Sequence, residues 1–316
     1  GLEVVNSGAR PGIEALLKVA GISQKELDSE DIAFKLAPRL NAAGRMGHAD
    51  IAVELLTTKD ERRASELAMM LDSMNRQRQE IEKKVLLHIL AYMDKNPGML
   101  KRKTLVLAHP DWHEGILGIV ASRIVEKYFR PAILISAKNG VGKGSGRSIP
   151  GINLYEGLMS CSDLFEDFGG HAMAAGIQIR TENIRTFRER FEETIREMST
   201  DEHYSKTVMI DEELDFARIS DRLIDEMEIL KPFGTDNPEP LFMAQNVSVN
   251  YSKILGSNHR KMVLKQGNDK RTFMAIQFHI DPTESPPEYF EKIAFRLRWN
   301  RWQQRKDPQL LIEETQ

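Results

Sequence analysis

The sequence has one cysteine, no long apolar run and no excess of positive charge. A single cysteine cannot form an internal disulfide, and we expect a reducing, cytoplasmic compartment. Cys161 also has no cysteine or histidine at zinc-ligand spacing, so we interpret it as a small buried apolar residue. No run approaches the roughly 20 apolar residues that a membrane-spanning helix requires, and no signal-peptide pattern opens the chain. The net charge of −3 gives no global electrostatic reason for nucleic-acid binding.

The length and composition are typical of a globular protein with about two domains. The chain has 316 residues, of which 41% are hydrophobic and 29% are charged. Residues 1–58 read as short helices around loops, with helices at 13–20 and 50–57. Residues 59–97 read as one long connecting helix, because apolar residues recur near a 3.6-residue period. The middle of that helix, 75–82, is highly polar, and we expect it to bridge solvent.

The rest of the chain predicts an α/β domain followed by a β domain. Over 98–200, strands are expected at 104–109, 131–135 and 175–179, and helices at 116–128, 153–168 and 181–198. Residues 201–316 contain seven short stretches typical of strands, interrupted by one helix at 219–230. This pattern favours a small β-barrel, although periodicity alone does not distinguish a barrel from a sandwich. The predicted fold class is therefore α/β plus β.

Two glycine-rich segments carry the side chains best suited to chemistry. Residues 169–176 read Gly-Gly-His-Ala-Met-Ala-Ala-Gly, where the backbone can approach a ligand closely and His171 remains as a donor or proton carrier. The plainer alternative is a tight turn with a core histidine. Residues 143–148 place the Ser145 hydroxyl and the Arg147 guanidinium on what reads as a glycine-rich loop, a set that suits phosphate oxygens. The alternative there is a hairpin with exposed polar residues.

Four segments make the sequence similar to the RecJ family, the bacterial single-strand-specific DNA exonucleases of the DHH phosphoesterase superfamily. They are residues 40–46 (LNAAGRM), 112–123 (WHEGILGIVASR), 144–148 (GSGRS) and 170–176 (GHAMAAG), in the family's order. Other superfamily members and alanyl-tRNA synthetases share the last segment, whereas all four together are specific. The resemblance implies a DHHA1-like α/β domain over 98–200 and an OB-fold-like nucleic-acid-binding barrel over 201–316.

The metal-binding half of the family is missing from this sequence. There is no His-His pair and no Asp-x-Asp, and the chain begins at Gly1 without a methionine. We interpret it as the C-terminal portion of a longer enzyme, obtained by design or by proteolysis, with residues 1–58 as the tail of the DHH catalytic domain. The resemblance implies hydrolysis assisted by two Mn²⁺ or Mg²⁺ ions, whose ligands lie outside this chain.

The resemblance also implies an activity and roles for several residues. The parent enzyme would degrade single-stranded DNA from 5′ to 3′ and release nucleoside monophosphates in repair and recombination. Ser145 and Arg147 would receive the 5′-terminal phosphate. His171, next to Gly170, would donate to a non-bridging oxygen of the scissile phosphate. The implied partners are single-stranded DNA and a single-strand-binding protein, without a membrane.

Two further segments have less specific expectations. Residues 41–47 read as a Gly/Ala loop that carries Asn41 and Arg45. The resemblance implies that this loop lies near the substrate channel, with Arg45 as a candidate contact to the strand backbone. Trp112 either stacks on a base or packs against the sheet. Glu114 is expected near the substrate, although an acidic residue at a helix start also stabilises the helix dipole.

We expect a single-strand platform on the barrel, where cations alternate with tryptophans. Stacking on aromatic rings and cations along the backbone are the usual means of binding single strands. Alternate residues of a strand face opposite sides, so at least one tryptophan is expected to pack inside. The alternative is a solvated basic face. The expected members are His259, Arg260, Lys261, Arg298, Trp299, Arg301 and Trp302.

Two other functions remain open from the residues alone. The chain could be a non-catalytic protein that anchors strands for a separate nuclease, which the start of the natural reading frame would distinguish. It could also belong to a superfamily phosphodiesterase that acts on short oligonucleotides or cyclic dinucleotides. The basic aromatic segment of the barrel argues against the latter, because a very small substrate needs no extended track.

Overall fold

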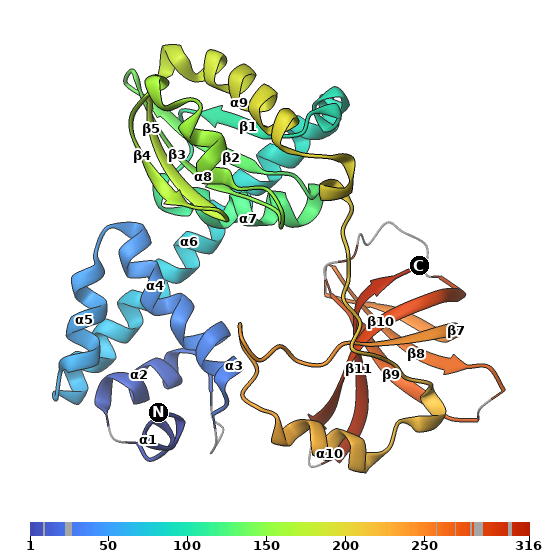
Figure 1. The fold of residues 1–316 in the computed structure, drawn as a ribbon. Coiled ribbons are helices and arrows are strands. Elements are labelled where there is room, and N and C mark those ends of the chain that lie inside the picture. The colour runs from blue at the N-terminus through green and yellow to red at the C-terminus, as the bar shows by residue number, and fades with distance from the viewer. Residues whose placement is uncertain are drawn as a thin grey trace. The chain divides into compact units, whose positions relative to one another are not determined.

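The computed structural model describes residues 1–8, 10–22, 27–256, 258–268, 270–278, 280, 287–302 and 305–316, without the side chains of Trp302 and Arg305. The chain divides into two compact units, Gly1–Lys206 and Thr207–Gln316. The first unit contains a helical N-terminal part and an α/β domain, and the second contains a β-barrel (Figure 1).

The helical N-terminal part packs on the first half of the long helix α6 (Glu61–Lys95). Its core includes Leu16, Leu55, Leu67 and Leu71, all fully buried. Its other elements are α1 (Leu2–Asn6), α2 (Pro11–Val19), α3 (Ser29–Asp31), the π-helical turn η1 (Ile32–Leu36), α4 (Ala37–Met46) and α5 (Ala49–Thr57).

Helix α6 belongs to two hydrophobic cores and runs through the first unit (Figure 1). The Asp60 side chain caps its start by accepting hydrogen bonds from two backbone N–H groups. At 1.5 Å per residue, its 35 residues span roughly 50 Å. Its polar middle is exposed on one side, at Arg76, Gln77, Gln79 and Glu80, whereas Asn75 and Glu82 on the other side are only 4% and 5% exposed. On the buried side, Glu82 pairs with Arg78 and with Arg123 of the helix 117–128.

The α/β domain is a five-stranded sheet in the order β1-β2-β3-β5-β4. Only β1 and β2 are parallel, and the other pairs are antiparallel. The second half of α6 and helix α7 (Leu117–Tyr128) cover one face, while α8 (Leu154–Met159) and α9 (Ile184–Met198) cover the other. The strands are β1 (Leu105–His109), β2 (Ala132–Lys138), β3 (Val141–Arg147), β4 (Phe165–His171) and β5 (Ala174–Arg180).

Three segments differ from the sequence-based expectation. The helix expected at 153–168 ends with α8 at Met159, and 165–171 instead form the edge strand β4. The expected loop at 143–148 lies mostly in the central strand β3, where a Cβ on Gly144 would lie 2.7 Å from Cγ1 of Ile177. Here the bulky neighbours leave no room for a side chain. The expected loop at 41–47 is the end of α4, because Ala42 and Ala43 are buried in a helix that Gly47 terminates at φ 97°.

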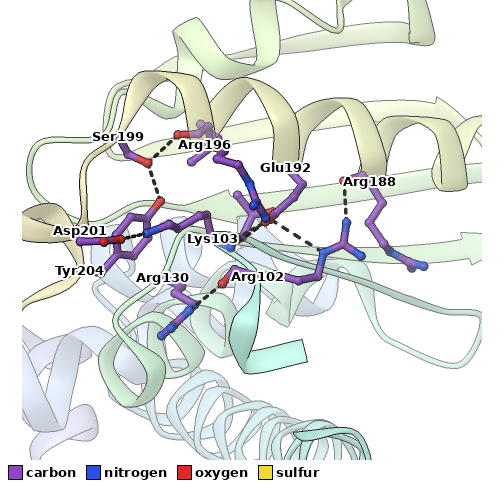
Figure 2. A network of polar contacts seen from close by, with 11 residues as sticks. Arg102, Lys103, Arg130, Arg188, Glu192, Arg196, Ser199, Asp201 and Tyr204 are labelled. Atoms are coloured by element: carbon purple, nitrogen blue, oxygen red, sulfur yellow. Dashed lines mark hydrogen bonds and ion pairs between the residues drawn. The ribbon is translucent and has the colours of Figure 1, made fainter. Parts of the chain in front are cut away.

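A polar network holds the end of the α/β domain together (Figure 2). The buried Glu192 carboxylate of α9 accepts from the backbone N–H groups of Lys103 and Thr104, at 2.8 and 2.9 Å, and from the Thr104 hydroxyl. Arg196 donates to it at 3.0 Å. The segment after α9 is attached to the same network, because Lys103 pairs with Asp201 and lies 4.2 Å above the Tyr204 ring. This segment is thereby fixed to the first unit.

The second unit is a closed five-stranded barrel with strand order β7-β8-β9-β11-β10 and a final β10–β7 pairing. The short strand β6 (Glu212–Glu213) pairs in parallel with the start of β7, and the helix α10 (Asp221–Ile229) precedes the barrel. Its core includes the fully buried Phe216 and Phe295. The expected barrel is therefore confirmed, with longer strands: β7 (Phe242–Leu255), β8 (His259–Gln266), β9 (Thr272–Gln277), β10 (Tyr289–Trp302) and β11 (Arg305–Thr315).

Candidate phosphate site and nucleic-acid interface

Ser145 and Arg147 lie on β3 and point to the same face of the sheet, because they are two residues apart on one strand. Nη1 of Arg147 donates to Oγ of Ser145 at 3.3 Å and to the Gly146 carbonyl at 2.7 Å. Leu134, the register partner of Ser145, belongs to the core beneath α7. The two polar groups therefore face the side of the sheet on which α7 begins.

The start of α7 comes close to both side chains. A Cβ on Gly118 would lie 2.8 Å from Nη2 of Arg147 and 3.1 Å from Oγ of Ser145. Gly118 is in the first turn of the helix, where the helix dipole favours an anion. The 3₁₀ turn Glu114–Ile116 leads into this helix, and its Glu114 carbonyl accepts from the Leu117 N–H. The guanidinium, the hydroxyl and the helix start thus gather around one location. All three are donors suited to phosphate oxygens.

Arg45 reaches the same region from α4. Its carbonyl oxygen would lie 2.0 Å from a Cβ on Gly115, so this contact between α4 and the start of α7 requires glycine. Its Nη1 lies 3.4 Å from the Gly115 carbonyl oxygen. Burial, and then the charge of Arg45, hold the pKa of the Arg147 guanidinium below its ordinary value. Asn41 lies one turn before Arg45 on the same face of α4 and is exposed.

Two more arginines join this group, and the sequence-based reasoning missed them. Arg78 of α6 donates to Glu82 at 3.1 Å, and Nε of Arg123 of α7 lies 2.6 Å from the other Glu82 oxygen. Burial lowers the pKa of Arg78, with Glu82 opposing this shift and the charges of Arg45 and Arg123 adding to it. In the described part of the chain, Glu82 is the one carboxylate that pairs with these arginines. Four positive charges against one negative charge favour an anion here.

Arg78 and Glu82 both lie in the polar stretch 75–82 of the long helix. From the sequence, this polar stretch is expected to bridge solvent. Only the packing of α4 and α7 on this stretch makes them buried.

His171 ends β4 at the open edge of the sheet. The register aligns Arg147 of β3, Ala174 of β5 and His171 in one row, so the Cα atoms of Arg147 and His171 are roughly 10 Å apart. Nδ1 of His171 accepts from the Met173 N–H at 3.3 Å, which leaves Nε2–H as the donor of the neutral ring. Gly170 has φ 149°, and a Cβ there would lie 2.3 Å from the Ala174 carbonyl oxygen. This tight hairpin presents the exposed imidazole on the same face as Arg147.

Trp112 is buried in the core, and Glu114 forms an ion pair. Trp112 is 5% exposed and packs in the core beneath α7, so it is not available for stacking on a base. Its ring stacks against that of His109, with the centroids 5.8 Å apart. Glu114 lies 3.2 Å from Nζ of Lys143 on β3. Glu114 therefore neutralises a cation on the strand that carries Ser145 and Arg147.

The expected platform on the barrel is divided among different faces. His259 and Lys261 lie on the outer face of β8, whereas Arg260 is 3% exposed and points to the inside. This alternation is the ordinary period of a strand, so the three residues do not form one surface. The side chain of Trp302 lies outside the described residues.

The β10 members of the platform are already paired with carboxylates. Arg298 forms a bidentate pair with the buried Glu239. The indole N–H of Trp299 donates to Asp225 of α10 at 2.8 Å, and the ring packs partly against the barrel core. Arg301 pairs with Glu228 of the same helix. The basic aromatic segment is thus largely a contact with α10 and with the segment before β7.

The described residues do not fit a metal ion. They contain no group of three or more histidine, cysteine, aspartate or glutamate residues that could hold one. No helix among them is long and apolar enough to cross a membrane.

Known families match both units. Residues 101–197 match the DHHA1 domain, and residues 210–314 match the RecJ OB domain. The single-stranded-DNA-specific exonuclease RecJ of Bacillus subtilis is 34% identical over 321 residues, covering 100% of this chain and 40% of that protein. RecJ of Escherichia coli is 32% identical over 327 residues, covering 99% of this chain and 56% of that protein. The chain thus spans about half the length of these relatives.

Solved structures agree with these matches. RecJ from Thermus thermophilus in complex with Mn²⁺ has a TM-score of 0.84 and 28% identity, covering 100% of this chain and 45% of that one. An exonuclease RecJ bound to manganese has a TM-score of 0.54 and 34% identity over 62% of this chain and 48% of that one. The chain is therefore a RecJ homologue that carries a DHHA1 domain and a RecJ OB domain and aligns with part of the RecJ chain.

Proposed function

We propose that this chain supplies the phosphate-binding and strand-binding parts of a cytoplasmic exonuclease that degrades single-stranded DNA from 5′ to 3′. The observation that carries the proposal is the convergence of Ser145 and Arg147 on Gly118 in the first turn of α7, with Arg45 at Gly115 in the turn just before that helix. The relatives named as single-stranded-DNA-specific exonucleases support the substrate and the reaction. Our proposal includes the release of nucleoside monophosphates and a role in repair and recombination. Single-strand-binding protein is the partner that we propose with it.

We propose that residues 1–58 are the tail of a DHH catalytic domain and that 59–97 connect it to the DHHA1 domain at 98–200. Residues 201–316 are then the nucleic-acid-binding barrel. Mn²⁺ or Mg²⁺ bound by residues outside this chain would serve the hydrolysis, as the metal ions named with the solved relatives suggest. No step of the mechanism below depends on such an ion.

The proposed pocket binds the 5′-terminal phosphate through charge and geometry. Arg147 offers the Nη2 group beside Gly118, and Ser145 offers a hydroxyl that lies next to the same glycine. Donors that are already oriented lose little freedom when an anion arrives, and charge-assisted hydrogen bonds are the stronger kind. The positive charge of Arg45 adds to the attraction. A terminal phosphate carries more negative charge than a terminal hydroxyl, so the pocket would prefer the phosphorylated end.

The proposed role of His171 is to donate Nε2–H to a non-bridging oxygen at the next phosphate. The Met173 N–H holds Nδ1, which fixes the ring orientation and the neutral donor form. A donor aimed at developing negative charge lowers the barrier by roughly 2.7–4 kcal/mol in comparable sites. In the longer exonuclease that we propose, His171→Ala should lower turnover by about 100-fold while strand binding persists. Unchanged turnover would make the histidine structural.

The pocket is tested by the affinity of the 316-residue chain for two otherwise identical single strands, one with a 5′ phosphate and one with a 5′ hydroxyl. Fluorescence anisotropy should give tighter binding of the phosphorylated strand. Arg147→Ala should remove this preference and weaken binding of the phosphorylated strand by roughly 10-fold or more, because charged hydrogen bonds contribute about 1.5–3 kcal/mol.

Arg190→Ala is the matched control for this test. It removes the same charge from α9, on the opposite side of the sheet, where Arg190 pairs with Asp163. The control should keep the preference for the phosphorylated end. Equal losses with both strands in Arg147→Ala would refute the pocket.

A further inference from the structure

Glu82 of α6 is a buried carboxylate between two arginines, and it is only 5% exposed. Its Oε2 accepts from Nη1 of Arg78 at 3.1 Å, and its Oε1 lies 2.6 Å from Nε of Arg123 on α7. Nε of Arg78 is also buried and has no hydrogen-bond partner in the described part of the chain. We call these three residues the α6–α7 ion-pair cluster.

The α6–α7 ion-pair cluster lies close to the proposed phosphate pocket. Arg123 is five residues beyond Gly118 on the same helix, so their Cα atoms are roughly 9 Å apart in regular helix geometry. Burial is the main cause that lowers the pKa values of Arg78 and Arg147, and the charge of Arg45 lowers both further. The cluster and the pocket therefore share one electrostatic environment.

Positive charge is in excess in this environment. Arg45 and Arg147 have no carboxylate partner among the residues that the structure describes. The nearby Glu114 is balanced by Lys143 at 3.2 Å. The four arginines of the cluster and the pocket therefore face the single carboxylate of Glu82, which leaves three positive charges in excess. A terminal phosphate carries about −1.5 to −2 charges at pH 7 and would be attracted by this excess.

Glu82 competes with such a phosphate for guanidinium groups. Carboxylates and phosphates both accept charge-assisted hydrogen bonds from arginine. While Glu82 holds Arg78 and Arg123, their charge is partly neutralised and attracts a ligand less strongly. Without Glu82, four like charges would lie close together in partly buried surroundings, where salt screens them little. The carboxylate thus stabilises the empty pocket and weakens its attraction for phosphate.

The plainer role of Glu82 is to fasten α6 to α7, but two observations favour the charge role. Arg78 lies four residues before Glu82 on the same helix, so this ion pair fastens no other element to α6. The Arg123 side chain is 47% exposed, and ion pairs at such exposure contribute little to stability. We therefore attribute more to the charge of Glu82 than to its contact with α7.

We propose that Glu82 sets the affinity of the phosphate pocket, as a built-in carboxylate that competes with the 5′-terminal phosphate for the arginines. An exonuclease that removes one nucleotide at a time must release each terminal phosphate before it takes the next, so the affinity of the pocket has to be limited. This role rests on the proposed function, because it concerns the regulation of the same site.

Glu82→Gln and Arg123→Gln test the role, because they break the same ion pair and change the charge in opposite directions. Fluorescence anisotropy with the 316-residue chain measures the affinity for a 5′-phosphorylated single strand. Glu82→Gln should bind this strand about 3- to 10-fold more tightly than the unaltered chain, and Arg123→Gln about 3- to 10-fold more weakly. The double variant has the original net charge and should bind within about 2-fold of the unaltered chain. Binding of a 5′-hydroxyl strand should change less in each variant.

Glu192→Gln is the matched control. Glu192 is likewise buried and pairs with two arginines, Arg102 and Arg196, but it belongs to the network between α9 and β1 (Figure 2). This control removes the same charge and should lower the thermal midpoint, yet it should leave the affinity for both strands unchanged. It separates an effect on the pocket from the general loss of a buried carboxylate.

The outcomes also separate this role from the proposed pocket. Opposite shifts in Glu82→Gln and Arg123→Gln support the role, whereas equal weakening in both, or a result for Glu82→Gln that matches Glu192→Gln, refutes it. In either refuting case, a persisting preference for the 5′-phosphate leaves the pocket intact. An unaltered chain without that preference would refute the pocket and the role of Glu82 together.

The double variant decides the question if Glu82→Gln does not fold. It should bind the phosphorylated strand more tightly than Arg123→Gln does, because it carries one more positive charge in the cluster. Equal or weaker binding by the double variant would refute the role of Glu82.

Discussion

At the scale of single residues, Gly118 connects packing with the proposed recognition of phosphate. A methyl group there would lie 2.8 Å from Nη2 of Arg147, a flexible side-chain end that can move aside. Gly118→Ala should therefore leave the free energy of unfolding unchanged or raise it by less than about 1 kcal/mol, because alanine favours helix. The displaced guanidinium should reduce the preference for a 5′-phosphate by about 3- to 10-fold. Denaturant unfolding and anisotropy measure the two effects, and an unchanged preference would contradict our placement of the phosphate.

The residue types alone predicted three members of this site but did not identify the other two arginines. Ser145, Arg147 and Arg45 were found because hydroxyl and guanidinium groups stand out among glycines and alanines. Their roles remain proposals, but the structure does bring them to one region. Arg78 could not be found in the same way, because a charged residue in a long helix is ordinarily solvated. Arg123 ends the segment 112–123 that carries the family resemblance, but its residue type alone did not indicate this site. Their position depends on which helices pack on α6, and this is information that no local pattern contains.

At the scale of secondary structure elements, Glu192 links α9 to the start of β1 through the network in Figure 2. Burial raises the pKa of Glu192, but hydrogen bonds from Lys103, Thr104 and Arg196 outweigh it, so the pKa lies below its ordinary value. A lowered carboxyl pKa stabilises the folded state above the unfolded value of about 4.3, and this contribution is lost as pH falls through the folded pKa.

Glu192→Gln should accordingly lower the free energy of unfolding by about 1–3 kcal/mol near pH 7, since charged hydrogen bonds are replaced by neutral ones. The difference from the unaltered chain should shrink below about pH 4.3. Urea unfolding at several pH values measures it. Glu193→Gln, at the neighbouring exposed position, provides the control for the charge change. A difference that is independent of pH would argue against the assigned ionisation.

The prediction of helices and strands was correct where apolar residues recur at a regular spacing. It was wrong where a high content of glycine and alanine was taken to indicate a loop. The long helix follows from its spacing of apolar residues and is confirmed. The barrel, which the short strands favoured and the family resemblance implied, is confirmed as well. The glycines of β3 suggested a loop, yet they are required by the isoleucines that pack against the strand. The alanines of 41–47 suggested a loop because of their glycine neighbours, although alanine is the best helix former. In both cases tertiary packing decided the structure.

At the scale of the whole molecule, the two units have separate cores and should respond separately to core substitutions. Phe216 is fully buried in the barrel core. Phe216→Ala should destabilise the barrel by about 3–5 kcal/mol and leave the unfolding of Gly1–Lys206 nearly unchanged. Hydrogen exchange of the two units, measured along a denaturant series, distinguishes them. An equal shift in both would mean that the chain unfolds as one cooperative body.

The continuity of α6 also sets a rule for how such chains can change in length. Leu71 is anchored in one core and Val85 in another, with a single unbroken helix between them. Each residue inserted there would turn one anchor by about 100° relative to the other and move it by about 1.5 Å. Surface loops tolerate insertions well. Between Leu71 and Val85, however, an insertion would rotate one buried anchor out of its core. Similar chains should therefore keep the same number of residues between these two anchors. Any difference in length there should be close to a whole number of helical turns.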